Sequence, residues 1–494
     1  MRFLLQVTLT LWAAYIVQAA ERPNIVLVMC DDLGWGDVGF NGGEDIQTPH
    51  LDAMAKASLR FERFYAAAPV CSPTRGSCIT GRHPFRYGIY FANTGHMKPE
   101  ELTLAELLKK HGYTTGHFGK WHLGTLTKTD KDANRGGPQG KKHFSPPQAN
   151  GFDVCFSTES KVPTWNPMDK PKVDARRTWW DISDDTEPYG TAYWDEKGRR
   201  VTKNLAGANS RVILDRAIPF MRSAAQKEQP FFTIVWFHTP HLPVVAGPEY
   251  ARMYADEDKY TQHYRGCITA MDEQVGRLRN ELRAMGVANN TLVTFCSDNG
   301  PEGKADSAPG SAGHLNGRKR DLLEGGIRVP GLIEWPGKIR PGNTTMPAVT
   351  SDYLPTILDL IGAKPVGDRP LDGISLRPLF NGPMKNRGQS IGFQSAGQVA
   401  LIGDRFKLWG RAGGKQVDKL PTLKLFDLVN DPSEKTDVAA QHPEVVARMT
   451  RELKTWRASL EASDRGEDYP AKYLRRPRGR WPRPIENCSR LTSR

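Results

Sequence analysis

The 494-residue sequence predicts an α/β fold, in which helices sandwich a large mixed β-sheet and a smaller C-terminal α+β subdomain follows. Three observations predict it: apolar runs of strand length, helical patterns between them, and short strand-like segments after about residue 385. The composition, with 38% hydrophobic and 25% charged residues, is that of an ordinary globular protein.

Three apolar runs carry the prediction of a buried sheet. They cover residues 24–29, 231–237 and 291–295, and none alternates as a half-exposed strand does. Helical patterns occupy residues 102–110, 210–226 and 260–285. Strands that alternate with helices favour an α/β sandwich, in which ligand sites lie past the carboxyl ends of the strands.

The start of the chain predicts export. Arg2 is followed by a mostly apolar run from Phe3 to Val17, and small residues near Ala19 and Ala20 offer a cleavage site. We therefore expect residues 1–20 to be a signal peptide and the mature protein to be secreted or periplasmic. No later stretch reaches membrane-spanning length, so we expect no membrane span.

The rest of the chain is expected to form a main domain over residues 21–384 and a C-terminal subdomain over residues 385–470. Within the main domain, residues 125–205 are rich in Gly, Pro, Lys and Asp, and are interpreted as a loop-rich insertion. This insertion contains four tryptophans, Trp165, Trp179, Trp180 and Trp194. They would either stack on sugar rings or pack the loops together, and the sequence leaves both readings open.

The charge is concentrated at the end of the chain. The formal net charge is +13, and a basic tail at residues 471–494 contributes +7 of it. We interpret this tail either as a solvated segment or as an attachment to an acidic polysaccharide or surface. We expect no nucleic-acid partner.

The seven cysteines are widely spaced and odd in number, which does not fit a dense disulfide scaffold. Some of them could form disulfides, but the sequence does not assign the pairs. Cys30 and Cys296 each end an apolar run just before acidic residues. This pattern predicts that both are buried near one site.

Two acidic pairs follow predicted strands. Asp31 and Asp32 come after the first strand, and Asp298 and Asn299 come after the third. Alone, either pair could cap a helix or form a turn. Together, three carboxylates and an amide oxygen form a hard-oxygen set suited to Ca²⁺ or Mg²⁺, which predicts a metal site at these strand ends.

Residues 71–82, Cys-Ser-Pro-Thr-Arg-Gly-Ser-Cys-Ile-Thr-Gly-Arg, form the most specific local pattern. They resemble the signature of the type I, formylglycine-dependent sulfatases, a family with the alkaline phosphatase superfold. In that family the cysteine of Cys-x-Pro-Ser/Thr-Arg is oxidised to formylglycine (3-oxoalanine) before folding. The alternative for Cys71 is an ordinary buried or disulfide-bonded cysteine.

The resemblance extends over nearly the whole mature chain. Residues 31–37 look like the family's opening metal loop, and residues 119–124, Gly-Lys-Trp-His-Leu-Gly, look like its central Lys/His motif. Further similar segments are His241-Leu-Pro243, Lys319 with the run 324–330, and Leu425 to Leu428 followed by 431–434. The chain is thus expected to be arylsulfatase-like.

The resemblance implies a role for each matching residue. Asp31, Asp32, Asp298, Asn299 and the modified residue 71 would hold a divalent cation, Ca²⁺ rather than Mg²⁺. The aldehyde hydrate made from Cys71 would be the nucleophile, with Arg75 and His122 on its oxygens and Lys120 and Lys319 on the sulfate. His241 would protonate the leaving alcohol, sharing the task with Lys319. His238 is also near enough in sequence to face the pocket, but the His-x-Pro context favours His241.

The predicted function is therefore hydrolysis of sulfate esters outside the cytoplasm, with a sulfated carbohydrate as the expected substrate. The resemblance implies one further partner, a formylglycine-generating or anaerobic sulfatase-maturing enzyme. Two alternatives stay open. One is a phosphodiester or phosphonate monoester hydrolase of the same superfold, and the other is a non-catalytic binder of sulfated glycans in which Cys71 is unconverted.

Overall fold

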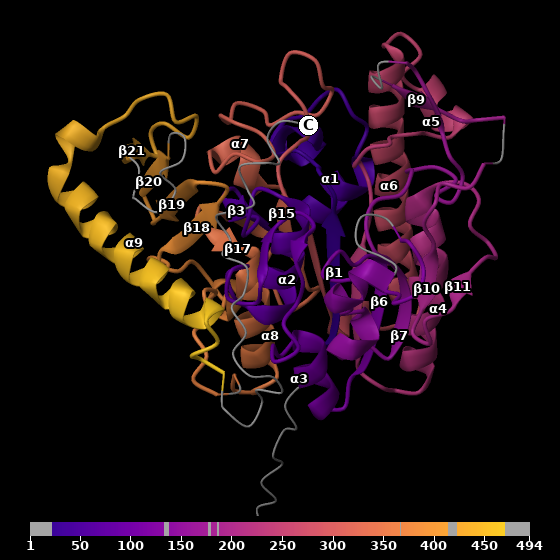
Figure 1. The fold of residues 1–494 in the computed structure, drawn as a ribbon, viewed down its shortest axis with the longest axis horizontal. Coiled ribbons are helices and arrows are strands. Elements are labelled where there is room, and N and C mark those ends of the chain that lie inside the picture. Colours follow the sequence, from indigo (N-terminus) through magenta and orange to yellow (C-terminus); the bar gives the residue numbers. More distant parts are fainter. Residues whose placement is uncertain are drawn as a thin grey trace, which may run out of the picture.

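A computed structural model describes residues 22–132, 138–175, 179–184, 187–365, 367–412 and 422–469, so the predicted signal peptide and basic tail lie outside the described residues. A ten-stranded mixed sheet runs through the molecule in the order β11-β10-β7-β6-β12-β1-β13-β15-β2-β16 (Figure 1). Helices pack on it, and a separate antiparallel sheet follows near the C-terminus. The predicted fold class is confirmed.

The centre of the sheet is parallel. β1 (Asn24–Cys30) lies between β12 (Phe231–Trp236) and β13 (Thr291–Ser297), which confirms the three strands predicted from apolar runs. Next to β12 lie β6 (Thr114–Lys120) and then β7 (Val154–Thr158), both parallel. Parallel strands bring their carboxyl ends to the same edge, so residues that follow β1, β6, β12 and β13 become neighbours.

Antiparallel strands complete the sheet on both sides. They are β15 (Gly331–Glu334) and β2 (Leu59–Phe61) on one side, and β10 (Tyr193–Asp195) and β11 (Arg200–Val201) on the other, with β16 (Gly342–Thr344) parallel to β2. β7, β10 and β11 fall inside residues 125–205. The description of this segment as a loop-rich insertion is therefore incomplete, because part of it extends the main sheet.

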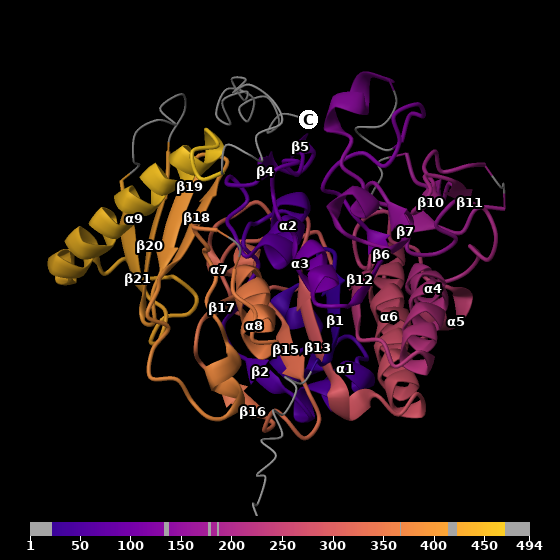
Figure 2. The ribbon, with the colours of Figure 1, turned by 90° about the horizontal axis from the view of Figure 1, so that it is seen from below.

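Two sets of helices cover the two faces of the sheet. α1 (Pro49–Lys56), α4 (Asn209–Gln226) and α6 (Lys259–Ala284) pack on one face, and α2 (Cys71–Thr80), α3 (Leu104–Lys110) and α8 (Tyr353–Leu360) pack on the other (Figure 2). Side chains of β1 alternate between the two cores: Ile25, Leu27 and Met29 face one, and Val26, Val28 and Cys30 the other. Burial on both faces explains why β1 is continuously apolar.

The C-terminal region is a four-stranded antiparallel sheet covered by one long helix. It contains β18 (Ile391–Ser395), β19 (Gln398–Ile402), β20 (Phe406–Arg411), β21 (Lys424–Asp427) and α9 (Pro443–Asp464). One face of the sheet packs on α9, as Leu401 and Leu408 do against Leu453. The other face packs on the main part of the molecule, where Phe393 meets Tyr65 (Figure 1).

Short elements fill the connections. They are α5 (Pro248–Arg252), α7 (Glu324–Ile327), the sheet β14 (Arg328–Val329), β3 (Phe64–Tyr65), β17 (Ala348–Val349), and the pairs β4 (Ile89–Phe91) with β5 (Thr94–Gly95) and β8 (Lys172–Val173) with β9 (Trp180–Asp181). Among the helices of the described residues, none has the length and apolar character needed to cross a membrane.

The four tryptophans of residues 125–205 contribute to packing. Trp194 is buried, and its indole Nε1 donates to the Asp132 carboxylate at 2.8 Å. Trp180 meets Tyr260 edge-on with ring centroids 5.8 Å apart, and Trp179 and Trp165 are half-buried. Within the described part of this segment, these contacts therefore support the interpretation that the tryptophans pack the loops together.

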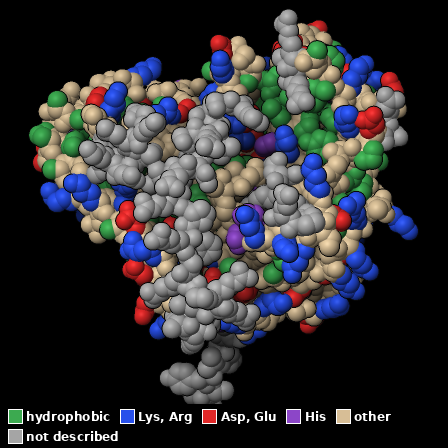
Figure 3. Space-filling view, viewed as in Figure 1, with side chains coloured by type: hydrophobic (Ala, Val, Ile, Leu, Met, Phe, Trp, Pro, Cys, Tyr) green, Lys and Arg blue, Asp and Glu red, His purple; other side chains and the backbone are tan. Residues whose placement is uncertain are grey.

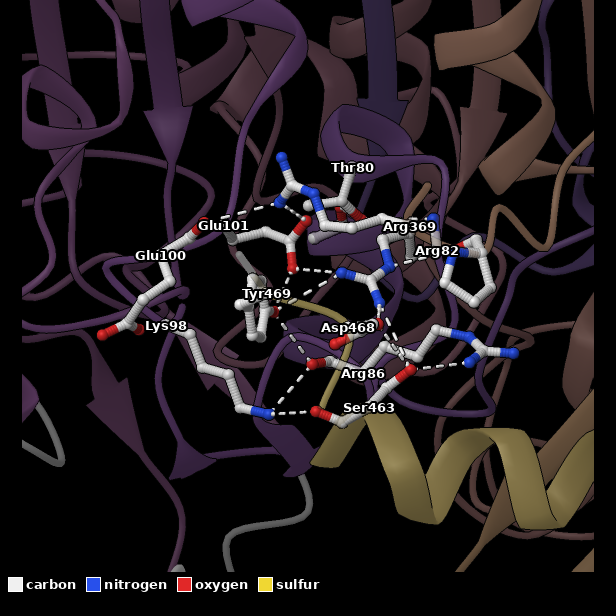
Figure 4. Close-up of polar contacts among 12 residues, drawn as sticks. Thr80, Arg82, Arg86, Lys98, Glu100, Glu101, Arg369, Ser463, Asp468 and Tyr469 are labelled. Carbon is white, nitrogen blue, oxygen red and sulfur yellow. Dashed lines mark hydrogen bonds and ion pairs between the residues drawn. The ribbon is translucent and has the colours of Figure 1, made fainter. Parts of the chain in front are cut away.

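The end of the described chain returns to α2 through a polar cluster (Figure 4). Arg82, just past the C-terminus of α2, pairs with Glu101 at 2.9 Å and with Asp468. The Tyr469 hydroxyl donates to Glu101 at 2.5 Å, and Nη2 of Arg82 donates to the Ser463 hydroxyl at 3.3 Å. The segment from Ser463 to Tyr469 is named here the C-terminal clasp.

Candidate active site

The carboxyl ends of the parallel strands converge on one polar cluster. The backbone N–H of Asp31 donates to the Thr239 carbonyl at 3.0 Å, which ties the end of β1 to the loop after β12. The N–H of Asp298 donates to the Cys30 carbonyl at 3.1 Å, and the N–H of Asp32 donates to Oδ1 of Asp298 at 3.1 Å. Asp32 has a φ of 69°, a left-handed conformation that non-glycine residues adopt only where their surroundings enforce it.

Cys71, the first residue of α2, belongs to the same cluster. It is 2% exposed and is an unpaired thiol, as are the other five cysteines of the described residues, Cys30 and Cys296 among them. Ligand atoms of Asp31, Cys71 and Asp298 all lie within 4.8 Å of one another. Burial raises the pKa of the Cys71 thiol, so an unmodified cysteine would stay protonated here.

Three buried cations balance the three carboxylates. Arg75 donates from Nε and Nη2 to one oxygen of Asp298, at 3.0 and 2.7 Å. Nζ of Lys120, the last residue of β6, lies 2.6 Å from Asp31, and Nζ of Lys319 lies 2.6 Å from Asp32. Buried charges of one sign would be unstable, so this pairing is what allows the acids to be clustered.

Two oxygens of the cluster have no hydrogen-bond partner, Oδ1 of Asp31 and Oδ1 of Asn299. Both are fully buried, and an unpartnered buried oxygen is unfavourable unless something positive meets it. The side-chain amide of Asn299 donates to Asp32 at 2.8 Å, so its oxygen is free to face a cation. The donor set of Asp31, Asp32, Asp298 and Asn299 therefore fits a hard divalent metal.

The pKa values of two carboxylates of the cluster move in opposite directions. Although burial opposes it, the charges of Lys120, His241 and Arg75 hold the pKa of Asp31 well below its usual range. Burial, followed by the charge of Asp31, raises the pKa of Asp298 to about 7. Like charges at close range explain this divergence.

The two histidines after β12 have different surroundings. Nε2 of His241 lies 3.8 Å from Asp32, and its Nδ1 lies 2.7 Å from the Leu242 carbonyl. Since a carbonyl only accepts, Nδ1 carries a hydrogen and Nε2 is the atom left to exchange a proton. Burial lowers the pKa of His241 to about 4. His238 instead contacts Thr158 and Asn209, at 2.7 and 2.9 Å, and is fully buried.

His122 follows Lys120, the last residue of β6, by two positions and has a φ of 60°. Its Nε2 lies 2.7 Å from Oδ1 of Asn93 and 3.5 Å from Oγ of Ser160. Asn93 comes from the β4–β5 hairpin, and nothing in the sequence pattern around it pointed to the site.

Glu302 is a second residue that the sequence analysis missed. Its carboxylate lies 3.2 Å from Nζ of Lys319 and pairs with the Arg320 guanidinium through two contacts, at 2.5 and 2.9 Å. Against the effect of burial, Lys319 and Arg320 hold the pKa of Glu302 well below its usual range. Glu302 follows β13 by five residues, so the rule that sites lie past strand ends could have identified it.

Comparisons with known proteins agree with this arrangement. A family model described as Sulfatase matches residues 23–363. The chain is 32% identical to arylsulfatase A of Homo sapiens over 518 residues, which cover 94% of this chain and 95% of that protein. It is 33% identical to N-acetylgalactosamine-6-sulfatase of Mus musculus over 388 residues, which cover 75% and 68% of the two chains.

A solved structure shows the same architecture. The crystal structure of Ps i-CgsB in complex with k-i-k-neocarrahexaose superposes with a TM-score of 0.73 at 27% identity, covering 92% of this chain and 98% of the other. The chain belongs to the sulfatase family and is a sulfuric ester hydrolase.

Proposed function

We propose that this sulfatase acts outside the cytoplasm on a sulfated carbohydrate, using a divalent cation, Ca²⁺, and a formylglycine made from Cys71. The observation that carries the proposal is the convergence of Asp31, Cys71 and Asp298, from three separate elements, within 4.8 Å. One oxygen each of Asp31 and Asn299 accepts no hydrogen bond, which supports a cation at this point. Export rests on the pattern of residues 1–20 alone.

A formylglycine hydrate at position 71 would supply an oxygen nucleophile, and the cation would supply positive charge. A buried cysteine thiol supplies neither. Asp31, Asp32, Asp298 and Asn299 would hold the cation. Arg75, fixed by Asp298 and by the Lys120 carbonyl at 3.2 Å, would orient the hydroxyls of residue 71 together with His122.

The remaining residues would handle the sulfate and the leaving group. Lys120 and Lys319 present ammonium groups, and against the effect of burial their acidic neighbours raise the pKa of each, so both stay charged and can stabilise the sulfuryl oxygens. His241 would protonate the leaving alcohol from Nε2, sharing the task with Lys319. The negative charge of bound sulfate favours that protonation.

A carbohydrate substrate is supported by two relatives. Ps i-CgsB was solved with a neocarrahexaose, and another relative is named N-acetylgalactosamine-6-sulfatase. The tryptophans of residues 125–205 do not add to this argument, since Trp194 is buried and Trp180 packs against Tyr260. A formylglycine-generating or anaerobic sulfatase-maturing enzyme would be the required partner.

Two measurements test the proposal. Mass spectrometry of the peptide spanning Cys71, from protein made in a host with a maturing enzyme, should show loss of the sulfur and of two hydrogens and gain of one oxygen. Turnover of an aryl sulfate should exceed that of an aryl phosphodiester or phosphonate ester by orders of magnitude. An intact thiol in active protein, or a far better diester substrate, would contradict it. Cys71→Ala, expressed in the same host, is the matched inactive control.

A further inference from the structure

A fourth cation lies beside the cluster, on the segment that follows β7. Thr158, the last residue of β7, pairs with Lys120 in the sheet, and its carbonyl accepts from the Trp121 N–H at 3.0 Å. Two residues later, Ser160 meets the His122 ring at 3.5 Å. Thr164 then donates its N–H to the Pro243 carbonyl at 3.3 Å. Lys161 therefore lies on a stretch held between His122 and the loop of His241.

Lys161 differs from the other site lysines in exposure. Lys120 is fully buried and Lys319 is 8% exposed, whereas the Lys161 side chain is exposed. Desolvation by surrounding protein, followed by the charges of Lys120 and Lys319, lowers the pKa of Lys161. The charges of the two proposed sulfate-binding lysines therefore act on its ammonium group, although the side chain is exposed to solvent.

Lys161 also differs in its pairing. Lys120 is held by Asp31, and Lys319 by Asp32 and Glu302. Arg320, another exposed cation nearby, is held by Glu302. Across the residues that the structure describes, Lys161 forms no ion pair with a carboxylate. Figure 3 shows basic and histidine side chains together in a recess on one face of the molecule. An ammonium group that opens to solvent and has no carboxylate partner attracts anions.

We propose that Lys161 binds a second anionic group of the substrate, a carboxylate or a sulfate on the sugar next to the ester that is cleaved. The inference rests on the proposed function of the site and narrows its substrate class to saccharides with at least two anionic groups. The charges of Asp32 and Glu302 offset only part of the effect of Lys120 and Lys319 on Lys161, so an anion beside Lys161 would further reduce the repulsion among the three lysines. An ammonium group is a point charge, so it accepts a carboxylate or a sulfate without a geometric preference.

Matched pairs of saccharides test this binding. One pair is a sulfated amino sugar linked to a uronic acid and its carboxyl-reduced form, and the other is a disulfated and a monosulfated galactose disaccharide. Each is used as a competitor of aryl sulfate hydrolysis, and its Ki is measured with wild type, Lys161→Ala and Lys161→Arg. Lys172→Ala, at an exposed lysine of β8, is the control. Binding calorimetry of the same pairs gives the comparison without turnover.

The selectivity for the dianionic member of a pair is the readout. In at least one pair, wild type, K161R and K172A should bind the dianionic saccharide about tenfold more tightly than the saccharide with one anionic group fewer. A tenfold difference is what one partly exposed charged contact contributes. K161A should reduce this ratio to near one. The pair that responds tells whether the anion is a carboxylate or a sulfate. A ratio near one in wild type, or an unchanged ratio in K161A, overturns the inference. Failure of wild type to hydrolyse any sulfate ester contradicts the proposed function instead.

Discussion

Nη1 of Arg82 lies 2.9 Å from Oε2 of Glu101, and both side chains are only 1% exposed. Arg82 ends the twelve-residue pattern that begins at Cys71, yet its contacts lie at the opposite end of α2 from the cation site. Its guanidinium also meets Asp468 and the Tyr469 ring of the C-terminal clasp. The last residue of the motif therefore holds the helix of Cys71 to the C-terminal clasp.

Removing this charge should destabilise the fold. Arg82→Met removes the cation of the partly buried Asp468 carboxylate and one of the two cations that meet buried Glu101, the other being Arg369 at 3.1 Å. Breaking a buried pair costs up to about 3–5 kcal/mol. Urea unfolding should show a lower midpoint. Arg465→Ala, which removes an exposed ion pair with Glu467 in the same part of the chain, should leave the midpoint unchanged. Equal midpoints for wild type and R82M would contradict the prediction.

Added calcium should stabilise the protein. A ligand that binds only the folded state adds about 2.7 kcal/mol at a hundred times its Kd. The thermal midpoint should therefore rise with Ca²⁺, more than with Mg²⁺ at equal concentration, and chelation should reverse the rise and abolish turnover. Asp31→Asn should lose the response, while Asp45→Asn, at an exposed acid, should keep it. A thermal midpoint that changes with neither ion would contradict a metal site at these strand ends.

His241 should matter most for substrates with poor leaving groups. General acid catalysis contributes about 10²–10⁴-fold, and that gain is greatest when the departing oxygen is basic. For His241→Ala, kcat should fall far more on an alkyl or sugar sulfate than on a nitrophenyl sulfate. His238→Gln, which disturbs the contacts with Thr158 and Asn209, should lower stability without changing the dependence on the leaving group. A steeper dependence in H238Q than in H241A would reverse the two roles.

His83 should make stability depend on pH. It is buried between Phe85 and Trp456, and burial lowers its pKa to about 3 from an ordinary value of about 6.5. Below pH 6.5 the unfolded chain takes up a proton that the folded protein does not. The stability that His83 contributes is thus complete above pH 6.5 and is lost towards pH 3, by about 1.4 kcal/mol per pH unit.

The measurement is urea unfolding of wild type and His83→Gln between pH 7 and pH 5. The advantage of wild type over the variant should shrink by roughly 2 kcal/mol over this range. The neutral side chain of the variant cannot titrate, so it supplies the baseline. A difference between the two proteins that stays constant with pH would show that His83 charges equally in both states.

The central strands could be predicted from the sequence because a strand buried on both faces needs an uninterrupted apolar run. β1, β12 and β13 are apolar without interruption, and they appeared where expected. β6 was missed, since Gly116, His117 and Gly119 interrupt its apolar character. A Cβ at Gly119 would lie 1.9 Å from the Trp236 carbonyl oxygen, and its φ is 113°. Close approach of neighbouring backbones, which no local pattern records, selected glycine there.

The candidate site was predictable wherever a residue belonged to a strand end or a motif. Asp31, Lys120 and Asp298 follow or end parallel strands, so their convergence follows from the topology. Glu302 and Lys161 also follow parallel strands, β13 and β7, but that position does not show which charges they meet or lack in space. Such pairing depends on tertiary contacts and leaves no periodic trace in the chain.

The burial of Cys71 has a consequence for the order of biosynthesis. Residue 71 starts a helix in which every residue is buried, and the far end of that helix is closed by Tyr469, which is 387 positions further along the chain than Arg82. If residue 71 is oxidised as proposed, the maturing enzyme must reach it while the nascent polypeptide is still open. Oxidation of residue 71 would then have to precede folding of the C-terminal clasp onto α2, because a chain that folds before oxidation keeps a buried thiol at position 71.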